Sequence, residues 1–217
     1  MSGRTSGVLF LISAPSGAGK TTVCQNLLAA NSDLVRAITC TTRPARDGEV
    51  NGRDYYFLDE TEFISKIEGD AFLEHAVVYG NRYGTLKSEV QRLLESGKNI
   101  LLNIDVQGAA LLRRRAESDP LIRDSLVTVF LTPASWEELE RRLRSRATDS
   151  ETIILKRLRA AAVELGASEA FDYLVLSETM DEDRRRMETI LEGESMRRSR
   201  NQLPEVLCEA AEKWGTK

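Results

Sequence analysis

The sequence predicts an α/β fold in which a parallel sheet is flanked by helices. One observation is the order of elements at the amino end. Val8 to Ser13 (VLFLIS) is a continuous apolar run, typical of a strand buried on both faces, and a glycine-rich turn and a helix follow it. The other observation is that later apolar runs alternate with segments of helical periodicity, which indicates a parallel α/β core.

The first helix is expected from about Lys20 to Ala30, and Leu34 to Cys40 is a candidate strand. The chain from about 34 to 90 differs in character, with a long polar loop (TTRPARDGEVNGRD) and only short regular pieces. The β-like pieces are 55–57 and 72–79, and the helical patches are 59–67 and 86–95. This pattern predicts a small mixed insertion on the core.

Parallel α/β signals resume at Asn99. Buried strands are expected at 99–104, 127–131 and 172–176, and helices at 107–117, 135–144, 151–165 and 180–198. Asp105 follows the first of these strands, and Thr132 with Pro133 is expected to end the second. Residues 202–217 are expected to form one short amphipathic helix.

Composition favours one globular domain, or one core with small insertions. The chain has 217 residues, of which 41% are hydrophobic and 29% charged. No apolar run approaches the length of a membrane span, and no signal peptide is evident, so a cytoplasmic location is expected. The net charge of −4 disfavours a nucleic-acid binder. With three scattered cysteines and one histidine, neither a disulfide framework nor a structural zinc site is expected.

The turn after the first strand carries a phosphate-binding pattern. Residues 14–21 (APSGAGKT) match G-x-x-x-x-G-K-[ST] except for Ala14 at the first glycine. Gly17 and Gly19 permit backbone angles that point N–H groups at an anion, and the amino end of the next helix adds positive potential. Lys20 is expected to reach the β- and γ-phosphates and the Thr21 hydroxyl to ligate Mg²⁺. The strand before and the helix after it favour this interpretation over a chance glycine-rich turn.

The predicted ATP-binding residues are therefore Ala14, Pro15, Ser16, Gly17, Ala18, Gly19, Lys20, Thr21 and Thr22. This pattern alone indicates nucleotide phosphates and Mg²⁺, and it does not identify an acceptor.

A second anion site is suggested by Arg43 and Arg46, which lie three apart in the polar loop. Two guanidinium groups can clamp one phosphate, and Tyr55 and Tyr83 can add phenolic donors. Considered alone, such a pair of arginines is more often part of a solvated loop.

Glu74 is a candidate base reader. An ionised carboxylate accepts the adjacent N1–H and N2–H donors of guanine in parallel, whereas adenine presents an acceptor at N1. Considered alone, Glu74 could equally be an exposed carboxylate.

Several ordered segments together resemble guanylate kinase over residues of about 8 to 165. They are ISAPSGAGKTT, TTRPARDGEVNGRDYYF, FLEHAVVYGNRYGT, NIDVQG and RLRSRATDSETIILKRL. The resemblance implies a P-loop NTPase core (1–38 and 99–201), a GMP-binding subdomain (39–98) and a helical lid (about 141–158). The tail helix (202–217) is expected from the sequence pattern alone. It also implies Mg²⁺-dependent transfer of the ATP γ-phosphoryl group to GMP in purine metabolism.

The resemblance assigns roles residue by residue. Arg43, Arg46, Tyr55 and Tyr83 would hold the GMP phosphate, and Glu74 and Thr85 would read guanine with help from Thr39. Gly84 and Asp105 complete the expected GMP site. Lys20 and the lid arginines Arg142, Arg146 and Arg157 would stabilise the transferring phosphoryl group. ATP and GMP are the expected partners, and the resemblance decides neither the use of dGMP nor the oligomeric state.

The chain departs from the family pattern at several positions. Asn103 stands where an aspartate is usual, which removes a charge near the expected metal. Ser145 and Ala147 replace two lid glycines, Thr39 replaces a serine, and residues 177–179 (SET) replace a frequent N-D-D.

The implied mechanism needs no general base, because the acceptor phosphate is already largely ionised at pH 7. Positioning and charge stabilisation are the expected sources of catalysis. Rival interpretations are a kinase for another nucleoside monophosphate, a catalytically silent binding module, and a nucleic-acid binder. The arginine runs at 113–115, 184–186 and 197–198 are interpreted as solvated helix faces, and His75 as structural.

Overall fold

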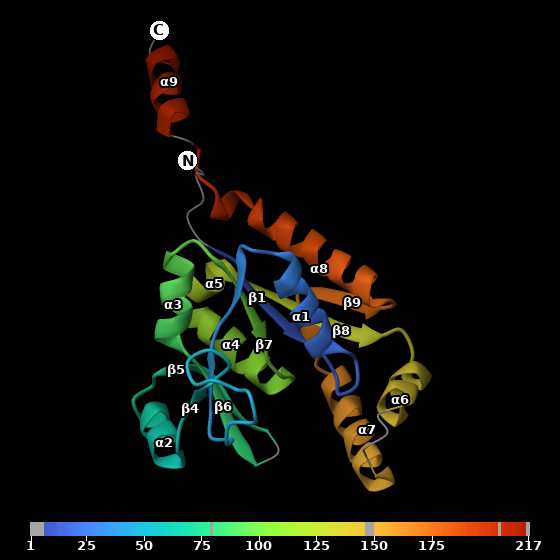
Figure 1. Ribbon diagram of the computed structural model, residues 1–217. Coiled ribbons are helices and arrows are strands. Elements are labelled where there is room, and N and C mark those ends of the chain that lie inside the picture. The colour runs from blue at the N-terminus through green and yellow to red at the C-terminus, as the bar shows by residue number, and fades with distance from the viewer. Residues whose placement is uncertain (1–6, 79, 146–149, 204, 216–217) are drawn as a thin grey trace.

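The computed structural model describes residues 7–78, 80–145, 150–203 and 205–215. Its core is a five-stranded, entirely parallel sheet with the strand order β2-β7-β1-β8-β9 (Figure 1). The strands are β1 (Leu9–Ser13), β2 (Leu34–Arg36), β7 (Asn99–Asn103), β8 (Leu126–Pro133) and β9 (Tyr173–Ser177). The α/β fold class expected from the sequence is confirmed.

Helices cover both faces of this sheet. They are α1 (Lys20–Ala30), α3 (Lys87–Glu95), α4 (Val106–Ser118), α5 (Pro120–Ser125), α6 (Trp136–Arg144), α7 (Glu151–Leu165) and α8 (Met180–Ser195). One face of β1, with Phe10 and Ile12, packs in a core with α1 and α8. The other face, with Leu9 and Leu11, packs with α3, α4 and α5. All five residues of β1 are buried, which explains its uninterrupted apolar sequence.

A second, mixed sheet lies beside the first, with the order β4-β3-β6-β5. Its strands are β3 (Thr39–Thr41), β4 (Tyr56–Phe57), β5 (Phe72–Val78) and β6 (Asn81–Leu86), and α2 (Glu60–Glu68) covers it. A small core of its own joins Cys40, Phe63 and Phe72. Gly84 belongs to this core, because a Cβ there would lie 2.8 Å from a ring carbon of Phe72. The second sheet corresponds to the small mixed insertion expected from the sequence.

Some expected elements differ in their bounds. The candidate strand 34–40 is two strands, β2 and β3, which belong to different sheets. Strand β6 and helix α5 were not expected. β8 continues through Thr132 and Pro133, which were expected to end it, because a proline at the last strand position costs little of the ladder. The expected end of the 72–79 strand at Tyr79 lies outside the described residues.

The carboxyl end of the chain is anchored by an arginine. Helix α8 ends at Ser195, before the expected residue 198, and a short 3-10 helix (Arg198–Arg200) follows. Arg200 is 2% exposed, pairs with the equally buried Glu194 at 2.6 Å, and donates to the carbonyl oxygen of Ser125. Beyond it, α9 (Glu205–Gly215) projects from the body (Figure 1) and exposes Val206 and Leu207.

Among the described helices, none has both the length and the apolar character needed to cross a membrane. A second 3-10 helix (Ser168–Ala170) connects α7 to β9.

Candidate active site

The phosphate-binding loop lies at the carboxyl end of the central strand β1. Gly17 and Gly19 have φ angles of 95° and 90°, in the left-handed region that favours glycine. Gly19 is the N-cap of α1, and the Ala18 N–H donates to the Pro15 carbonyl oxygen at 3.1 Å. The strand, turn and helix expected around this motif are all present, and the amino end of α1 points its free N–H groups into the loop.

Lys20 starts α1 and directs its amino group across the loop. Its Nζ donates to the carbonyl oxygen of Ile104, at the end of β7, at 2.7 Å. Burial lowers the pKa of Lys20, and the negative charges of Asp105 and Glu164 raise it in part. Thr21 and Thr22 follow in the first turn of α1 with exposed side chains. The ammonium group is therefore held at the loop by a neutral acceptor that a phosphate oxygen can replace.

Three strands of the second sheet bring the expected base-reading residues into register. Thr85 on β6 lies opposite Glu74 on β5 and opposite Thr39 on β3. The Thr85 hydroxyl donates to Oε1 of Glu74 at 2.7 Å. Glu74 is only 5% exposed. The sheet thus places Thr85 between the buried carboxylate of Glu74 on one side and Thr39 on the other.

Burial raises the pKa of Glu74 to about 7, and the nearby charge of Asp105 adds to this rise. The hydrogen bond from Thr85 opposes it. Without a further hydrogen-bond donor or a cation as partner, the Glu74 carboxyl therefore stays protonated to a higher pH than an exposed glutamate does.

The amino end of α4 supports Glu74 from the other side. Asp105 is the N-cap of α4, and its Oδ1 accepts the Gly108 N–H at 2.8 Å. A Cβ at Gly108 would lie 2.8 Å from Oε2 of Glu74. Glycine is thus required at this position for the Glu74 carboxylate to occupy its place. Asn103, at the end of β7, is exposed.

The loop between β3 and β4 carries Arg43, Arg46 and Tyr55 of the expected phosphate clamp, and β6 carries Tyr83. The Arg43 guanidinium lies 5.4 Å from the ring centre of Tyr55, and the Tyr55 and Tyr83 rings are 6.2 Å apart, edge to face. Arg43 also forms an ion pair with Glu49 at 2.8 Å. Glu49 accepts the backbone N–H of Arg46 at 2.8 Å as well, so this carboxylate joins the Arg43 side chain to the backbone of Arg46.

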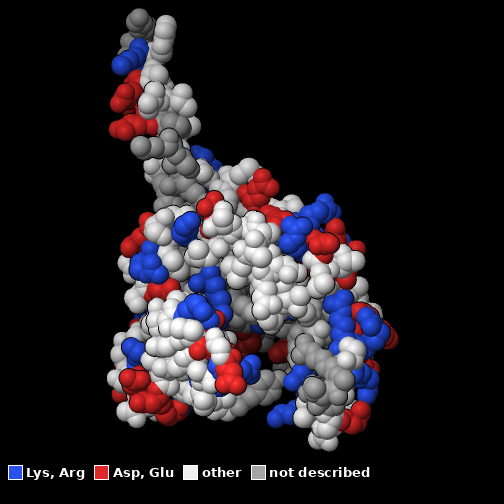
Figure 2. All heavy atoms as spheres, in the orientation of Figure 1, with Lys and Arg blue, Asp and Glu red and all other residues white. Residues whose placement is uncertain are grey.

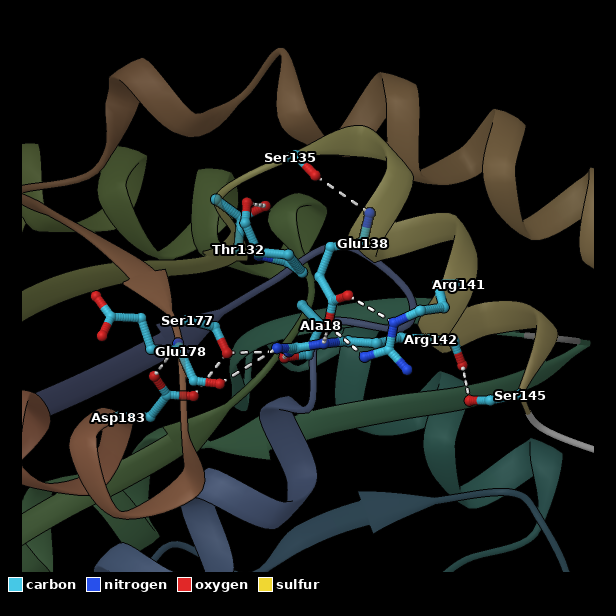
Figure 3. Close-up of polar contacts among 11 residues, drawn as sticks. Ala18, Thr132, Ser135, Glu138, Arg141, Arg142, Ser145, Ser177, Glu178 and Asp183 are labelled. Carbon is cyan, nitrogen blue, oxygen red and sulfur yellow. Dashed lines mark hydrogen bonds and ion pairs between the residues drawn. The ribbon is translucent and has the colours of Figure 1, made fainter.

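Arg142 on α6 reaches the back of the phosphate loop (Figure 3). Its guanidinium pairs with Glu138 at 2.7 Å and donates to the Ser177 hydroxyl at 2.9 Å and to the Ala18 carbonyl oxygen at 3.4 Å. The Ser177 hydroxyl in turn donates to Asp183 at 2.7 Å. Arg142 is therefore held by Glu138 of its own helix and by Ser177 at the end of β9, which α8 in turn holds through Asp183.

The next residue on α6 also contacts the loop, because a Cβ at Gly17 would lie 2.7 Å from Cγ of Leu143. Arg157 is half-buried on α7. Arg146, the third lid arginine of the prediction, lies outside the described residues.

The phosphate loop lies at the carboxyl edge of the parallel strands, where open α/β sheets bind ligands. The second sheet lies on one side of the phosphate loop and the helices α6 and α7 on the other (Figure 1). Figure 2 shows the surface hollowed between these two parts. The arrangement offers an anion-binding loop near a buried carboxylate, since the charge of Glu74 acts on Lys20. Arg43 lies in the β3–β4 connection of the second sheet and Arg142 at the back of the phosphate loop.

Sequence reasoning missed several residues of this neighbourhood: Glu49, Gly108, Glu138, Glu164 and Ser177. Gly108 had a signal, because it ends the segment NIDVQG. Ser177 and Glu49 had none that local sequence could supply, since their partners Arg142 and Arg43 are set by tertiary packing and by a loop conformation. Within the described part of the chain, no group of three or more His, Cys, Asp or Glu residues is arranged to hold a metal ion.

Comparison with known proteins identifies the family. The guanylate kinase family model matches residues 6–194. The chain is 42% identical over 194 residues to a guanylate kinase of Zymomonas mobilis, covering 89% of this chain and 87% of the relative. It is 40% identical over 206 residues to a guanylate kinase of Clostridium perfringens, covering 95% and 91%.

The crystal structure of guanylate kinase from Anaplasma phagocytophilum superposes with a TM-score of 0.72 and 33% identity, over 97% of this chain and 96% of that one. The chain therefore belongs to the guanylate kinase family, the kinases that transfer the γ-phosphoryl group of ATP to GMP.

Proposed function

We propose that this chain carries out the guanylate kinase reaction in the hollow between its two sheets. ATP would bind on the phosphate loop, and GMP would bind against the second sheet. The observation that carries the proposal is the pairing of Glu74 with Thr85, which presents one buried carboxylate to the space beside the phosphate loop.

For ATP, the proposal uses the N–H groups of the loop and the amino end of α1. Lys20 would exchange the Ile104 carbonyl oxygen for the β- and γ-phosphates. The exposed hydroxyl of Thr21 suits a hard cation such as Mg²⁺, which prefers oxygen ligands and keeps most of its waters. Bound there, Mg²⁺ would supply positive charge to the phosphate oxygens of ATP.

For the guanine base, Glu74 would accept N1–H and N2–H together, with Thr85 and Thr39 beside it. An adenine base would leave the carboxylate facing an acceptor, which is costly in a buried site. GMP binding therefore favours the ionised form of Glu74, whose pKa burial raises to about 7.

For the GMP phosphate, Arg43, Arg46, Tyr55 and Tyr83 are the proposed ligands. Glu49 holds Arg43 and the Arg46 N–H in the structure. A phosphate dianion offers more acceptors and more charge than one carboxylate, so it can take over Arg43. Gly84 would leave room for the rings of Phe63 and Phe72 in the small core. Asp105 would lie on the side of the site where GMP binds.

For the transfer step, Arg142, Arg146 and Arg157 are proposed to offset repulsion between two anionic phosphates and to stabilise the transition state. Closure of the lid over both nucleotides would exclude water. We assign no general base.

The wider proposal includes a cytoplasmic location, where ATP and GMP are available, and no nucleic-acid partner. The subdomain and lid boundaries given above also remain proposals, as does the use of dGMP.

The test is Mg²⁺-dependent ADP formation from ATP with AMP, GMP, CMP or UMP in separate reactions. Turnover with GMP alone is expected. Turnover with another monophosphate would keep the kinase and overturn the assigned base reader. Binding of GMP without turnover by the folded protein would favour a silent binding module, with Asn103 as the first position to change to aspartate.

A further inference from the structure

A carboxylate of α7, on the lid side of the molecule, accepts a hydrogen bond from a backbone N–H of the phosphate loop. The backbone N–H of Ser16 donates to Oε2 of Glu164 at 2.9 Å, although the two residues are 148 positions apart in the chain. Glu164 lies near the carboxyl end of α7 and is half-buried. A loop donor that could take an anionic ligand is thus held by the protein itself.

The surroundings of Glu164 show that this contact is part of the site. Lys20 and Asp105 both lie close enough to affect its charge. Burial raises the pKa of the Glu164 carboxyl, and the hydrogen bond from Ser16 and the charge of Lys20 offset part of that rise. Partial burial of the Glu164 carboxylate costs free energy, and this cost suggests that the contact has a role in the site.

Helix α7 also carries Arg157, seven residues before Glu164. Seven residues are close to two helical turns, so the two side chains leave the same face of α7. The hydrogen bond at Glu164 therefore fixes the rotation and the height of the helix that presents Arg157. The helices α6 and α7 are thus both fastened to the loop, α6 through Leu143 and Arg142 and α7 through Glu164.

We propose that Glu164 is a positioning residue for phosphoryl transfer, which ties α7 to the phosphate loop through the Ser16 N–H and so sets the place of Arg157. This inference rests on the proposed function of Arg157. In this role Glu164 acts as a hydrogen-bond acceptor whose side chain has the length needed to reach the Ser16 N–H. The negative charge of Glu164 does not position Arg157.

The role predicts an unusual order among variants. Glu164→Gln keeps an oxygen acceptor at the same reach and loses the charge, so kcat stays within about threefold of the wild type, the scale of one weakened neutral hydrogen bond. Glu164→Asp keeps the charge but withdraws the acceptor by one methylene. It behaves like Glu164→Ala, and both lower kcat by about tenfold, the scale of a lost charge-assisted hydrogen bond. The KM for GMP changes little in all three.

The decisive measurement is a double-mutant cycle between Glu164→Ala and Arg157→Ala, with kcat for ATP and GMP as the readout. If Glu164 acts through Arg157, the double variant is no slower than Arg157→Ala alone. Multiplied losses would overturn the inference, and so would equal losses in the Gln and Ala variants. Arg157→Ala with wild-type kcat would instead refute the proposed role of Arg157.

A matched control is Glu169→Gln, an exposed carboxylate five residues further along with no contact to the phosphate loop among the described residues. It is expected to leave kcat unchanged. Thermal unfolding of every variant separates the two kinds of loss. A fall in kcat that tracks the fall in Tm across the Gln, Asp and Ala variants would assign Glu164 a structural role only.

Discussion

Glu74 carries two opposing demands on one side chain. Folding buries the carboxyl and raises its pKa to about 7, whereas the proposed binding of guanine needs the ionised form. The carboxyl of Glu74 is therefore expected to titrate near neutral pH. Thr85 reduces the cost of ionisation by donating to Oε1.

The first prediction concerns the pH dependence of GMP binding. Between pH 6 and pH 8, Glu74 passes from mostly protonated to mostly ionised, so the dissociation constant of GMP falls by about tenfold. Calorimetric titration of GMP at several pH values measures this. The GMP phosphate also titrates in this range, so Glu74→Gln serves as the control, and the difference between the two proteins isolates Glu74. Parallel pH profiles would contradict the prediction.

The second prediction concerns stability. The pKa of Glu74 is near 4.5 in an unfolded chain and about 7 in the folded one, so the folded state binds more protons between these values. The stability that Glu74 contributes is present below about pH 4.5 and is lost as the pH rises to about 7. A shift of this size corresponds to on the order of 3 kcal/mol.

Glu74→Gln removes this ionisation cost. The variant is therefore expected to unfold at a higher temperature than the wild type at pH 8 and to lose that advantage at pH 4.5. Denaturant unfolding at the two pH values measures the difference. An advantage of equal size at both pH values would show that packing, and not ionisation, distinguishes the variants.

At the scale of an element, the amino end of α4 determines where Glu74 can stand. Gly108→Ala would place a Cβ 2.8 Å from Oε2 of Glu74, so the carboxylate must move. We expect the KM for GMP to rise by about tenfold or more, because a displaced carboxylate loses its paired hydrogen bonds to the base. The KM for ATP should change little. Steady-state kinetics with each substrate varied in turn provides the measurement.

Gly193→Ala in α8 is the matched control. It is also a helical glycine, but a Cβ there meets nothing within 4 Å. It should raise stability by about 0.5 to 1 kcal/mol through helix propensity and leave both KM values unchanged. If both variants raised the KM for GMP, the effect could not be attributed to Glu74.

The same elements show what sequence reasoning can reach. The strands and helices of the parallel core were predicted because their apolar periodicity is local and strong, as in β1 and α1. Strand β6 was missed because NRYGTL has no apolar run or clean alternation, and it becomes a strand only by pairing with β3 and β5. β2 and β3 were joined in one prediction because nothing local marks the point where the chain leaves one sheet for another.

The residues of the candidate site also differ in whether local sequence can predict them. The phosphate loop could be predicted from spacing alone, because eight consecutive residues carry its chemistry. Glu74, Thr85 and Thr39 were assigned together only through the resemblance, since their alignment across three strands depends on long-range pairing. The contact between Ser16 and Glu164 spans 148 positions, and no local pattern in either segment indicates it.

At the scale of the whole molecule, Arg200 and Asn201 attach the end of the body to α8, and Arg200 is the buried one of the two. Its ion pair with Glu194 is as buried as the apolar core, with both side chains 2% exposed. Tyr173 and Arg197 also contact Glu194, so this carboxylate joins β9, α8 and the chain that follows it. The described residues beyond Asn201 are mostly exposed.

We therefore expect a chain ending at Asn201 to keep its stability and kinase activity. Arg200→Ala in the full chain should lose about 3 kcal/mol of unfolding free energy, because it removes the buried partner of Glu194 and leaves only the ion pair with the exposed Arg197. Denaturant unfolding of the two proteins tests both statements. Equal destabilisation by the truncation and the substitution would show that α9 contributes to the body.

The strand order of the parallel sheet has a consequence for folding during synthesis on the ribosome. β1 leaves the ribosome before the other described strands, and its two neighbours begin only at Asn99 and Leu126. At a synthesis rate of roughly 5 to 20 residues per second, the most apolar segment of the chain waits on the order of ten seconds for both partners. During that interval both edges of β1 are open to other nascent chains. In the folded protein the central position covers both edges of β1. During synthesis the same position leaves both edges unpaired for longest, so β1 is the strand that most needs a chaperone.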